Sequence, residues 1–210
     1  MGVLNVTPDS FWDGGHYRYA EAAVAQGLKL IAEGADIVDV GGESTRPGAV
    51  SPGVEEELQR VIPVIERLRK AGDIAISVDT SSPPVMRAAA AAGADMINDV
   101  SALRRPGALA AAVETGLPVC LMHMQGDPQT MQQRPAYVDV VAEVKAFLLQ
   151  RAAECMAAGV PRDCLILDPG FGFGKNLDHN LSLLRSLDAL VVTGFPVLVG
   201  LSRKSMLGEL

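Results

Sequence analysis

Seven short apolar runs recur along the chain, separated by segments with helical spacing. They cover residues 1–5, 36–42, 74–80, 95–100, 118–124, 164–170 and 196–202. Because these runs are apolar on both faces, they predict strands of a parallel sheet that is covered on both sides. The alternation of strand and helix along the whole length is typical of an α/β fold.

Two of the intervening segments predict long helices. In residues 52–71 the apolar side chains fall on one helical face. We expect Ser51 to cap this helix, Pro52 to be its first residue and Gly72 to end it. A second long helix is expected over residues 138–158, just before another glycine.

Nearly every strand-like run ends in a polar residue, and this decides between two α/β architectures. The residues at these ends are Asn5, Asp39, Asp79, Asn98, Asp99, His123, Asp168, Ser202, Arg203 and Lys204. In a TIM barrel all strand ends meet on one face, where active sites lie, whereas a doubly wound sheet needs them only at its switch point. We therefore expect a single domain over residues 1–210, a TIM (β/α)8 barrel with seven strands present and with strand 8 and the last helix missing.

Composition excludes several classes of protein. The 210 residues are 49% apolar, enough for one domain with a buried core. No apolar run approaches the ~18 residues that cross a bilayer, and the first residues lack the pattern of a signal peptide. The net charge of −7 argues against nonspecific nucleic-acid binding. Three scattered cysteines indicate buried thiols in a reducing compartment, so we expect a cytoplasmic protein without membrane or nucleic-acid partners.

The polar strand ends suit a flat heterocycle. Carboxylates and amides accept and donate hydrogen bonds in pairs, which matches a 2-amino-4-oxo edge. Asp79, Asn98 and Asp168 are the candidates for that edge, and Lys204 adds a donor and a positive charge. Asn5 offers a hard oxygen ligand for Mg²⁺, an ion that keeps several waters and bridges to substrate phosphate.

The run DPGFGFGKN resembles a phosphate-binding loop only superficially. It lacks the spacer and the Ser/Thr of a P-loop, and Lys175 stands where a dinucleotide loop has its third glycine. We expect its glycines to allow a sharp turn that brings Phe171 over a ligand.

Two glycine-flanked polar loops are expected to act as lids over the catalytic face. The first, residues 5–15, contains Asp13 followed by two glycines. The second, residues 41–51, contains Thr45 and Arg46 between glycine and proline.

Together these motifs resemble one family. The segments MGVLNVTPDSFWDGG, DIVDVGGESTRPGA, ISVDT, MINDVSA, LMHMQGDPQTMQ, LILDPGFGFGKN and VLVGLSRKS are similar to those of dihydropteroate synthases, pterin-binding TIM barrels of folate biosynthesis and targets of sulfonamides. The resemblance implies a transferase that joins p-aminobenzoate to 7,8-dihydropterin-6-ylmethyl diphosphate. The products are 7,8-dihydropteroate and diphosphate, the cofactor is Mg²⁺, and the complete enzyme is usually a homodimer.

The resemblance also implies roles for individual residues. It places the pterin against Asp79, Asn98, Asp168 and Lys204. It places Asn5 and Asp13 near the metal and the diphosphate. The residues implied around p-aminobenzoate are Thr45, Arg46, Pro47, Phe171 and Ser205. Those with an implied catalytic role are Asp79, Asp168, Lys204 and Arg46.

Two alternatives stay open at this point. Members of the family continue into a further strand with an Arg-x-His motif that contacts the leaving diphosphate, and neither His123 nor His179 occupies that place. The first alternative is therefore a truncated, inactive pterin-binding fragment. A pterin-dependent methyltransferase that serves corrinoid proteins is the other alternative, although such an enzyme does not need the STRPG and SRKS motifs.

Overall fold

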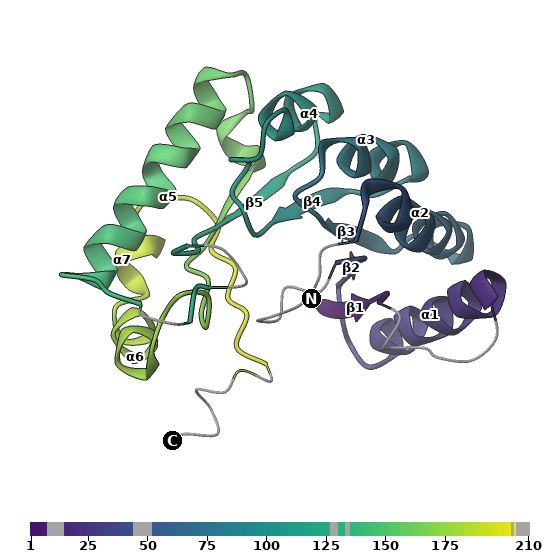
Figure 1. Cartoon of the computed structure of the whole chain (residues 1–210), viewed down its shortest axis with the longest axis horizontal. Helices are drawn as coiled ribbons and strands as arrows, with labels where there is room; N and C mark the ends of the chain where they lie inside the picture. The colour runs from purple at the N-terminus through teal and green to yellow at the C-terminus, as the bar shows by residue number, and fades with distance from the viewer. Residues whose placement is uncertain (8–14, 44–51, 127–129, 133–134, 203, 205–210) are drawn as a thin grey trace. The chain divides into compact units, whose positions relative to one another are not determined.

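The computed structural model describes residues 1–7, 15–43, 52–126, 130–132, 135–202 and 204 (Figure 1). The chain divides into two compact units. The first consists of Met1–Ser44, Val50–Asn98 and Arg105–Leu117, and the second of Thr45–Ala49, Asp99–Arg104 and Pro118–Leu210. Strands and helices alternate in both units, as the sequence predicts, while the assignment of residues 1–210 to one domain stays a prediction.

The first unit contains a parallel sheet whose strands pair in the order of the chain. These strands are β1 (Gly2–Asn5), β2 (Ile37–Gly41), β3 (Ala75–Asp79) and β4 (Met96–Asp99). The register aligns Asn5 with Gly41, Gly41 with Asp79, and Asp79 with Asn98. Neighbouring strands are thus successive in the sequence, without the reversal that marks a doubly wound sheet, and their carboxyl ends align at one edge.

Four helices lie along one face of these strands. They are α1 (Gly15–Ala32), α2 (Val54–Ala71), α3 (Pro83–Ala92) and α4 (Ala108–Thr115). Each packs against the next along the chain (Figure 1). Both α3 and α4 contain fully buried alanines, Ala89 and Ala111. Within the described residues, no helix combines the length and apolar character needed to cross a membrane.

Side chains of the first sheet alternate between an apolar and a polar face. Fully buried apolar residues on the helix-covered face are Val38, Val40, Ile76, Val78 and Ile97. The register of β2, β3 and β4 places four polar residues together on the opposite face: Asp39, Ser77, Asp79 and Asn98. The expectation that both faces are apolar is therefore wrong for this unit, because the helices cover only one face and polar groups meet one another on the other.

The end of the strands opposite these polar residues is held by Arg69 of α2. Its guanidinium donates to the carbonyl oxygen of Gly93 at 2.8 and 3.1 Å and pairs with Asp95. Asp95 in turn accepts from the backbone N–H of Ile76 at 2.8 Å.

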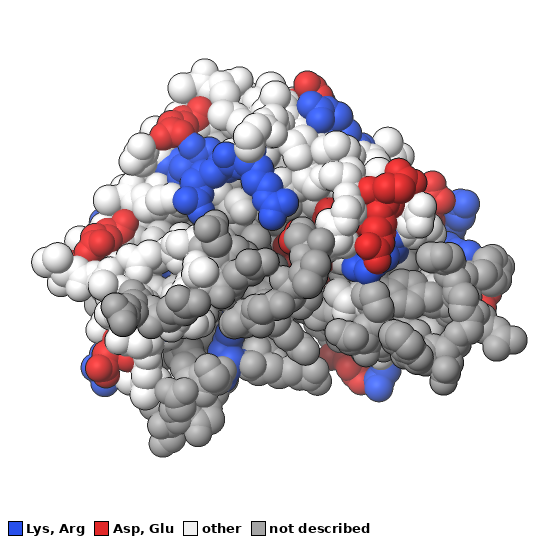
Figure 2. Space-filling view, in the orientation of Figure 1, with Lys and Arg blue, Asp and Glu red and all other residues white. Residues whose placement is uncertain are grey.

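More generally, acidic and basic side chains lie in small neighbouring groups on the face seen in Figure 2. Exposed pairs of this kind contribute about 0–1 kcal/mol each, so they tune stability more than they determine the fold.

The second unit is built around two parallel strands and one long helix. Its elements are β5 (Val119–Met122), α5 (Val140–Ala157), the 3-10 helix η2 (Arg162–Cys164), β6 (Leu165–Asp168), α6 (Leu177–Arg185) and α7 (Asp188–Val191). The register aligns Met122 with Asp168, and α5 packs on both strands. Helices α6 and α7 lie against α5 (Figure 1).

The predicted seventh strand is a single bridge rather than a ladder within the described residues. Leu167 of β6 pairs in parallel with Val197. Leu167 donates to the carbonyl oxygen of Pro196, and Leu198 donates to that of Leu167, both at 2.9 Å. Pro196 has no N–H group, so the pairing cannot extend backwards along this segment.

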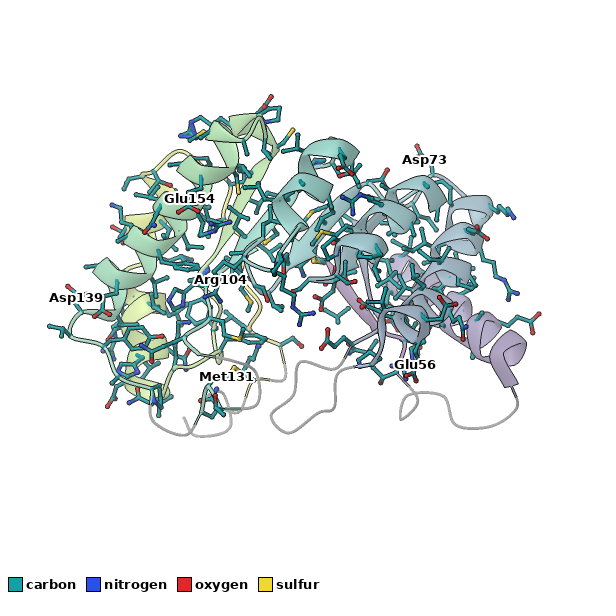
Figure 3. All side chains as sticks on the ribbon, turned by 45° about the horizontal axis from the view of Figure 1, so that its top comes forward. Glu56, Asp73, Arg104, Met131, Asp139 and Glu154 are labelled. Atoms are coloured by element: carbon teal, nitrogen blue, oxygen red, sulfur yellow. The ribbon has the colours of Figure 1, made fainter. Side chains whose placement is uncertain are left out.

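The two long helices begin slightly later than predicted. The residue before α2 is Gly53 in an extended conformation, and Ser51 lies outside the described residues. The prediction of Ser51 as the cap is wrong, and three glutamates in the first turn complement the helix dipole instead. Gly72 ends α2 as predicted. Asp139, labelled in Figure 3, caps α5 by accepting from the N–H groups of Val141 and Ala142 at 3.0 Å.

Candidate active site

The first unit brings three polar side chains together near the carboxyl ends of its strands. Asp79 and Asn98 are register partners on β3 and β4. Asn98 Nδ2 donates to Asp39 Oδ2 at 3.0 Å, across the intervening strand. The backbone N–H of Thr80 then donates to the carbonyl oxygen of Asn98 at 3.1 Å. Asp79 and Asn98, two residues expected at the heterocycle edge, are therefore held side by side.

Asp39 is the third member of this group, and the sequence alone predicts no role for it in the site. Its side chain is only 3% exposed, and burial raises the pKa of its carboxyl, while the Ser77 hydroxyl and the Asn98 amide oppose that shift. Within the described residues, Asp39 Oδ1 and Ser77 Oγ have no well-formed hydrogen bond. Asp39 fixes the orientation of the Asn98 amide, and its second oxygen is a buried polar atom on the same face.

A second buried carboxyl holds the end of β3 against α2. Thr80, the residue after Asp79, donates from Oγ1 to Glu57 Oε1 at 2.5 Å. Burial raises the pKa of Glu57. Arg60, one turn further along α2, donates to the carbonyl oxygen of Gly42 at 2.9 Å. These bonds connect the ends of β2 and β3 to the first turns of one helix and so position Asp79.

In the second unit, Asp168 ends β6 and starts a glycine-rich turn. Its backbone carbonyl accepts from the N–H of His123 at 2.9 Å, and its Oδ1 accepts from the N–H of Gly170 at 2.7 Å. Gly170, Gly172 and Gly174 all have left-handed φ values, between 65° and 78°. The sharp turn that the sequence predicts is present, and it fixes the Asp168 carboxylate at its first residue.

The aromatic ring beside Lys204 is that of Phe173. The Lys204 ammonium lies 4.1 Å from the centre of this ring. A buried methionine cluster, Met122, Met124 and Met131, packs against Phe173, and Figure 3 labels Met131. Phe171, which we expected over a ligand, is only 1% exposed in this structure. The sequence contains both phenylalanines one glycine apart, and only the turn decides which of them reaches Lys204.

Lys175 is a second residue whose role the sequence did not reveal. It is 2% exposed, and its Nζ lies 2.9 Å from His123 Nδ1. Burial lowers the Lys175 pKa to about 7, against the opposing effect of the Asp168 carboxylate. Burial and the nearby Lys175 charge lower the pKa of His123 to about 3. The imidazole is therefore neutral at neutral pH, and whenever Lys175 is charged its ammonium can only donate, so that Nδ1 is then the acceptor.

Several expected site residues lie outside the described residues. These are Asp13, Thr45, Arg46, Pro47 and Ser205. Asn5 is described, and it is an exposed residue at the end of β1. The described part of the chain contains no group of three or more His, Cys, Asp or Glu side chains that could hold a metal ion. Mg²⁺ does not need such a group, because it keeps several waters and uses one or two protein oxygens together with substrate phosphate.

Comparisons with known proteins agree with this arrangement. The family described as pterin binding enzyme matches residues 1–210. The dihydropteroate synthase of Escherichia coli strain K12 is 58% identical over 210 residues, which is 100% of this chain and 74% of that protein. The chain belongs to the dihydropteroate synthase family. Its relative in Haemophilus influenzae is 53% identical over 99% of this chain and 76% of that protein.

Solved dihydropteroate synthases share the fold. The Xanthomonas albilineans enzyme with 4-aminobenzoic acid has a TM-score of 0.93 and 57% identity, covering 100% of this chain and 74% of that one. The same enzyme in complex with 7,8-dihydropteroate has a TM-score of 0.89 and 54% identity, again covering 100% and 74%. A Yersinia pestis dihydropteroate synthase with a sulfonamide drug has a TM-score of 0.94 and 51% identity, covering 100% and 76%. These likenesses confirm the predicted TIM-barrel class.

Proposed function

We propose that this chain condenses p-aminobenzoate with 7,8-dihydropterin-6-ylmethyl diphosphate to give 7,8-dihydropteroate and diphosphate. The observation that carries the proposal lies at the Asp168 turn. The Asp168 carboxylate starts this turn, and the ring of Phe173, a later residue of the same turn, lies 4.1 Å from the Lys204 ammonium. A carboxylate, an ammonium and an aromatic face are the groups that a pterin and an arylamine require. The relatives with 4-aminobenzoic acid and 7,8-dihydropteroate support the same substrates.

The pterin is proposed to contact Asp79, Asn98, Asp168 and Lys204. Carboxylate oxygens accept from the ring N–H and amino groups, while Asn98 and Lys204 donate to ring acceptors. Because Asn98 already gives Nδ2 to Asp39 at 3.0 Å, the direction of its amide is set before the ligand arrives. Such preorganisation reduces the entropy lost on binding.

The arylamine is proposed to lie near Lys204 and the Phe173 ring, which takes the position expected for Phe171. Thr45, Arg46, Pro47 and Ser205 are proposed to complete this part of the site. Asn5 and Asp13 are proposed to bind Mg²⁺ with the substrate diphosphate. The ion supplies positive charge to the leaving diphosphate when it is bound.

The chemistry then follows from charge. The bond between the exocyclic methylene carbon and the diphosphate oxygen breaks, and the bonding electrons leave with the diphosphate. Asp79 and Asp168 favour the positive charge that spreads into the pterin ring. The arylamine nitrogen forms the new bond to the methylene carbon and releases its proton to the departing diphosphate. Loops 5–15 and 41–51 are proposed to cover the reacting atoms and exclude water.

Substitution of Asp168 by Asn tests the assignment of the pterin site. Asparagine has one acceptor oxygen where the carboxylate has two, and its NH2 group only donates, so it cannot reproduce the pair of acceptors that faces the pterin edge. The affinity for the dihydropterin diphosphate should therefore fall about tenfold or more. Asp163→Asn, an exposed carboxylate in η2, is the matched control and should leave that affinity unchanged. Equal pterin affinity in Asp168→Asn and the unmodified chain would contradict the assignment.

A coupled assay tests the reaction itself. Diphosphate release is measured with the dihydropterin diphosphate in the presence and absence of p-aminobenzoate. Release that depends on p-aminobenzoate supports the synthase, whereas pterin binding without turnover identifies the inactive fragment. Sedimentation analysis then tests the homodimer, and fractionation of cells tests the cytoplasmic location, both of which are part of the proposal.

A further inference from the structure

The turn that follows Asp168 has backbone carbonyls that are bound by side chains. Lys175 donates to the carbonyl oxygens of Gly170 at 2.9 Å and Phe173 at 3.0 Å. Two further carbonyls of the turn are bound by side chains of the same unit: Gln132 donates to Gly172, and Tyr137 donates to Gly174 at 2.8 Å. Because three left-handed glycines prevent a regular ladder here, these bonds determine the course of the turn.

Lys175 holds the two carbonyls that belong to functional positions. Gly170 donates its N–H to Asp168 Oδ1, so fixing Gly170 also fixes the carboxylate. Phe173 carries the ring that lies beside Lys204. The third short bond of the ammonium goes to His123 Nδ1 at 2.9 Å, in the loop after β5. The three protons of an ammonium thus match three acceptors at 2.9, 2.9 and 3.0 Å, and the carbonyl oxygen of His123 lies further away at 3.3 Å.

The turn packs tightly against the loop that carries His123. A Cβ atom on Gly170 would overlap the carbonyl oxygen of His123, and one on Gly174 would lie 2.5 Å from the carbonyl oxygen of Gln125. Lys175 therefore bridges two loops that already touch, and it is only 2% exposed. A buried ammonium is expensive unless it is fully hydrogen-bonded, so its presence needs a reason beyond filling space.

We propose that Lys175 is a positioning residue of the pterin site, whose ammonium orients the Asp168 carboxylate and the Phe173 ring through their backbone. This inference rests on the proposed function and adds to it a residue that touches neither substrate. It predicts that the chain binds the pterin better when Lys175 is charged than when it is neutral, because a neutral amine has only two protons for the three carbonyl oxygens around it.

The charges around Lys175 place its titration near neutrality. Burial lowers its pKa to about 7, the Asp168 carboxylate opposes this, and the Lys204 ammonium adds to it. His123 stays neutral because its own pKa is lowered to about 3, with a contribution from Arg104. The more distant titratable groups of this cluster are Tyr137, His179 and Glu143.

Lys175→Met tests the inference, because methionine has a similar length and lacks the charge. The probe is 7,8-dihydro-6-hydroxymethylpterin, titrated calorimetrically into the full chain at about pH 6 and about pH 8.5. The unmodified chain should bind about fivefold or more weakly at the higher pH, and Lys175→Met should bind about tenfold or more weakly at the lower pH. At each pH the affinity of the unmodified chain is divided by that of Lys175→Met, and this ratio cancels the titration of the ligand itself. A purely structural role would leave that ratio independent of pH.

A pair of His123 variants provides a matched control for folding. Asn places Oδ1 where Nδ1 of the imidazole lies and keeps the acceptor, whereas Leu removes it. Both variants lose the ring contacts with Phe147 and Tyr137, which lie 5.0 and 6.1 Å away between ring centres. His123→Asn should therefore keep the pterin affinity and its pH dependence, and His123→Leu should weaken that affinity.

The outcomes separate this inference from the proposed function. Failure of the unmodified chain to bind the dihydropterin would overturn the proposed function. Equal dihydropterin affinity in the unmodified chain and Lys175→Met, or a pH-independent ratio between them, would overturn the positioning role and leave the proposed function intact. Equal weakening by His123→Asn and His123→Leu would also count against it, because the acceptor would then be irrelevant.

Discussion

The buried imidazole of His123 should make the chain sensitive to mild acid. Its pKa is lowered from 6.5 to about 3, chiefly by burial. Between these two values the unfolded chain takes up a proton on His123 and the folded chain does not. The stability contributed by the neutral imidazole is therefore complete above pH 6.5 and is lost as the pH falls toward about 3.

The magnitude follows from the two pKa values. Each pH unit below 6.5 costs about 1.4 kcal/mol until the folded-state value is reached. Lowering the pH from about 7.5 to about 4.5 crosses two such units, so His123 alone should reduce the free energy of unfolding by about 2.7 kcal/mol. Lys175 adds about 0.8 kcal/mol to this loss, because its shift acts between its pKa of about 7 and the ordinary value of 10.5 and only the top of the range lies above 7.

Urea unfolding of the unmodified chain and His123→Asn at the two pH values measures this term. Asn keeps an acceptor for Lys175 and cannot be protonated, while the carboxylates titrate alike in both chains and cancel. The unmodified chain should lose about 2.7 kcal/mol more than the variant between about pH 7.5 and about pH 4.5. NMR titration of the His123 Cε1 proton is the direct check, with no shift expected above about pH 4. Parallel losses in the two chains, or an imidazole that titrates near 6.5, would refute the reasoning.

Two other substitutions test the packing. Gly170→Ala should lower the free energy of unfolding by about 3 kcal/mol or more, because its Cβ meets the His123 carbonyl oxygen. Gly116→Ala, at the same φ of 67° but in open space, should cost only about 1 kcal/mol, and equal thermal shifts would disprove the overlap. Thr80→Val removes the donor to buried Glu57 and should lower the free energy of unfolding by about 1–3 kcal/mol, measured in urea. An unchanged midpoint of the urea transition would contradict this.

Much of the fold could be predicted because it depends on local pattern. Apolar runs ending in polar residues marked the strands, and the register then placed Asp79 beside Asn98 as expected. The polar face of β2 and β3 was missed, because a run such as DIVDVGG reads as apolar although Asp39 lies in its middle. Hydrophobicity summed over a run hides the alternation that decides which face meets the helices.

The parts of the site that escaped prediction depend on contacts between distant segments. Phe171 and Phe173 have almost identical neighbours in the sequence, and the left-handed glycines between them decide which ring lies beside Lys204. Lys175 stood out only as the residue that breaks a nucleotide-binding motif. Its partner His123 is 52 positions away, and no local pattern joins the two.

The alternation of faces in β2 and β3 has a consequence for the genetics of this chain. Positions such as Val38, Val40 and Val78 determine how much folded protein accumulates, since each is fully buried against the helices. Asp39 and Asp79, one step along the same strands, face the other way. A scan of all substitutions along β2 and β3 should therefore alternate from one residue to the next: changes at one set of positions lower the amount of folded protein, and changes at the other set weaken ligand binding. Drug-resistant alleles that retain normal protein levels should map to the positions that face away from the helices, such as Asp39 and Asp79.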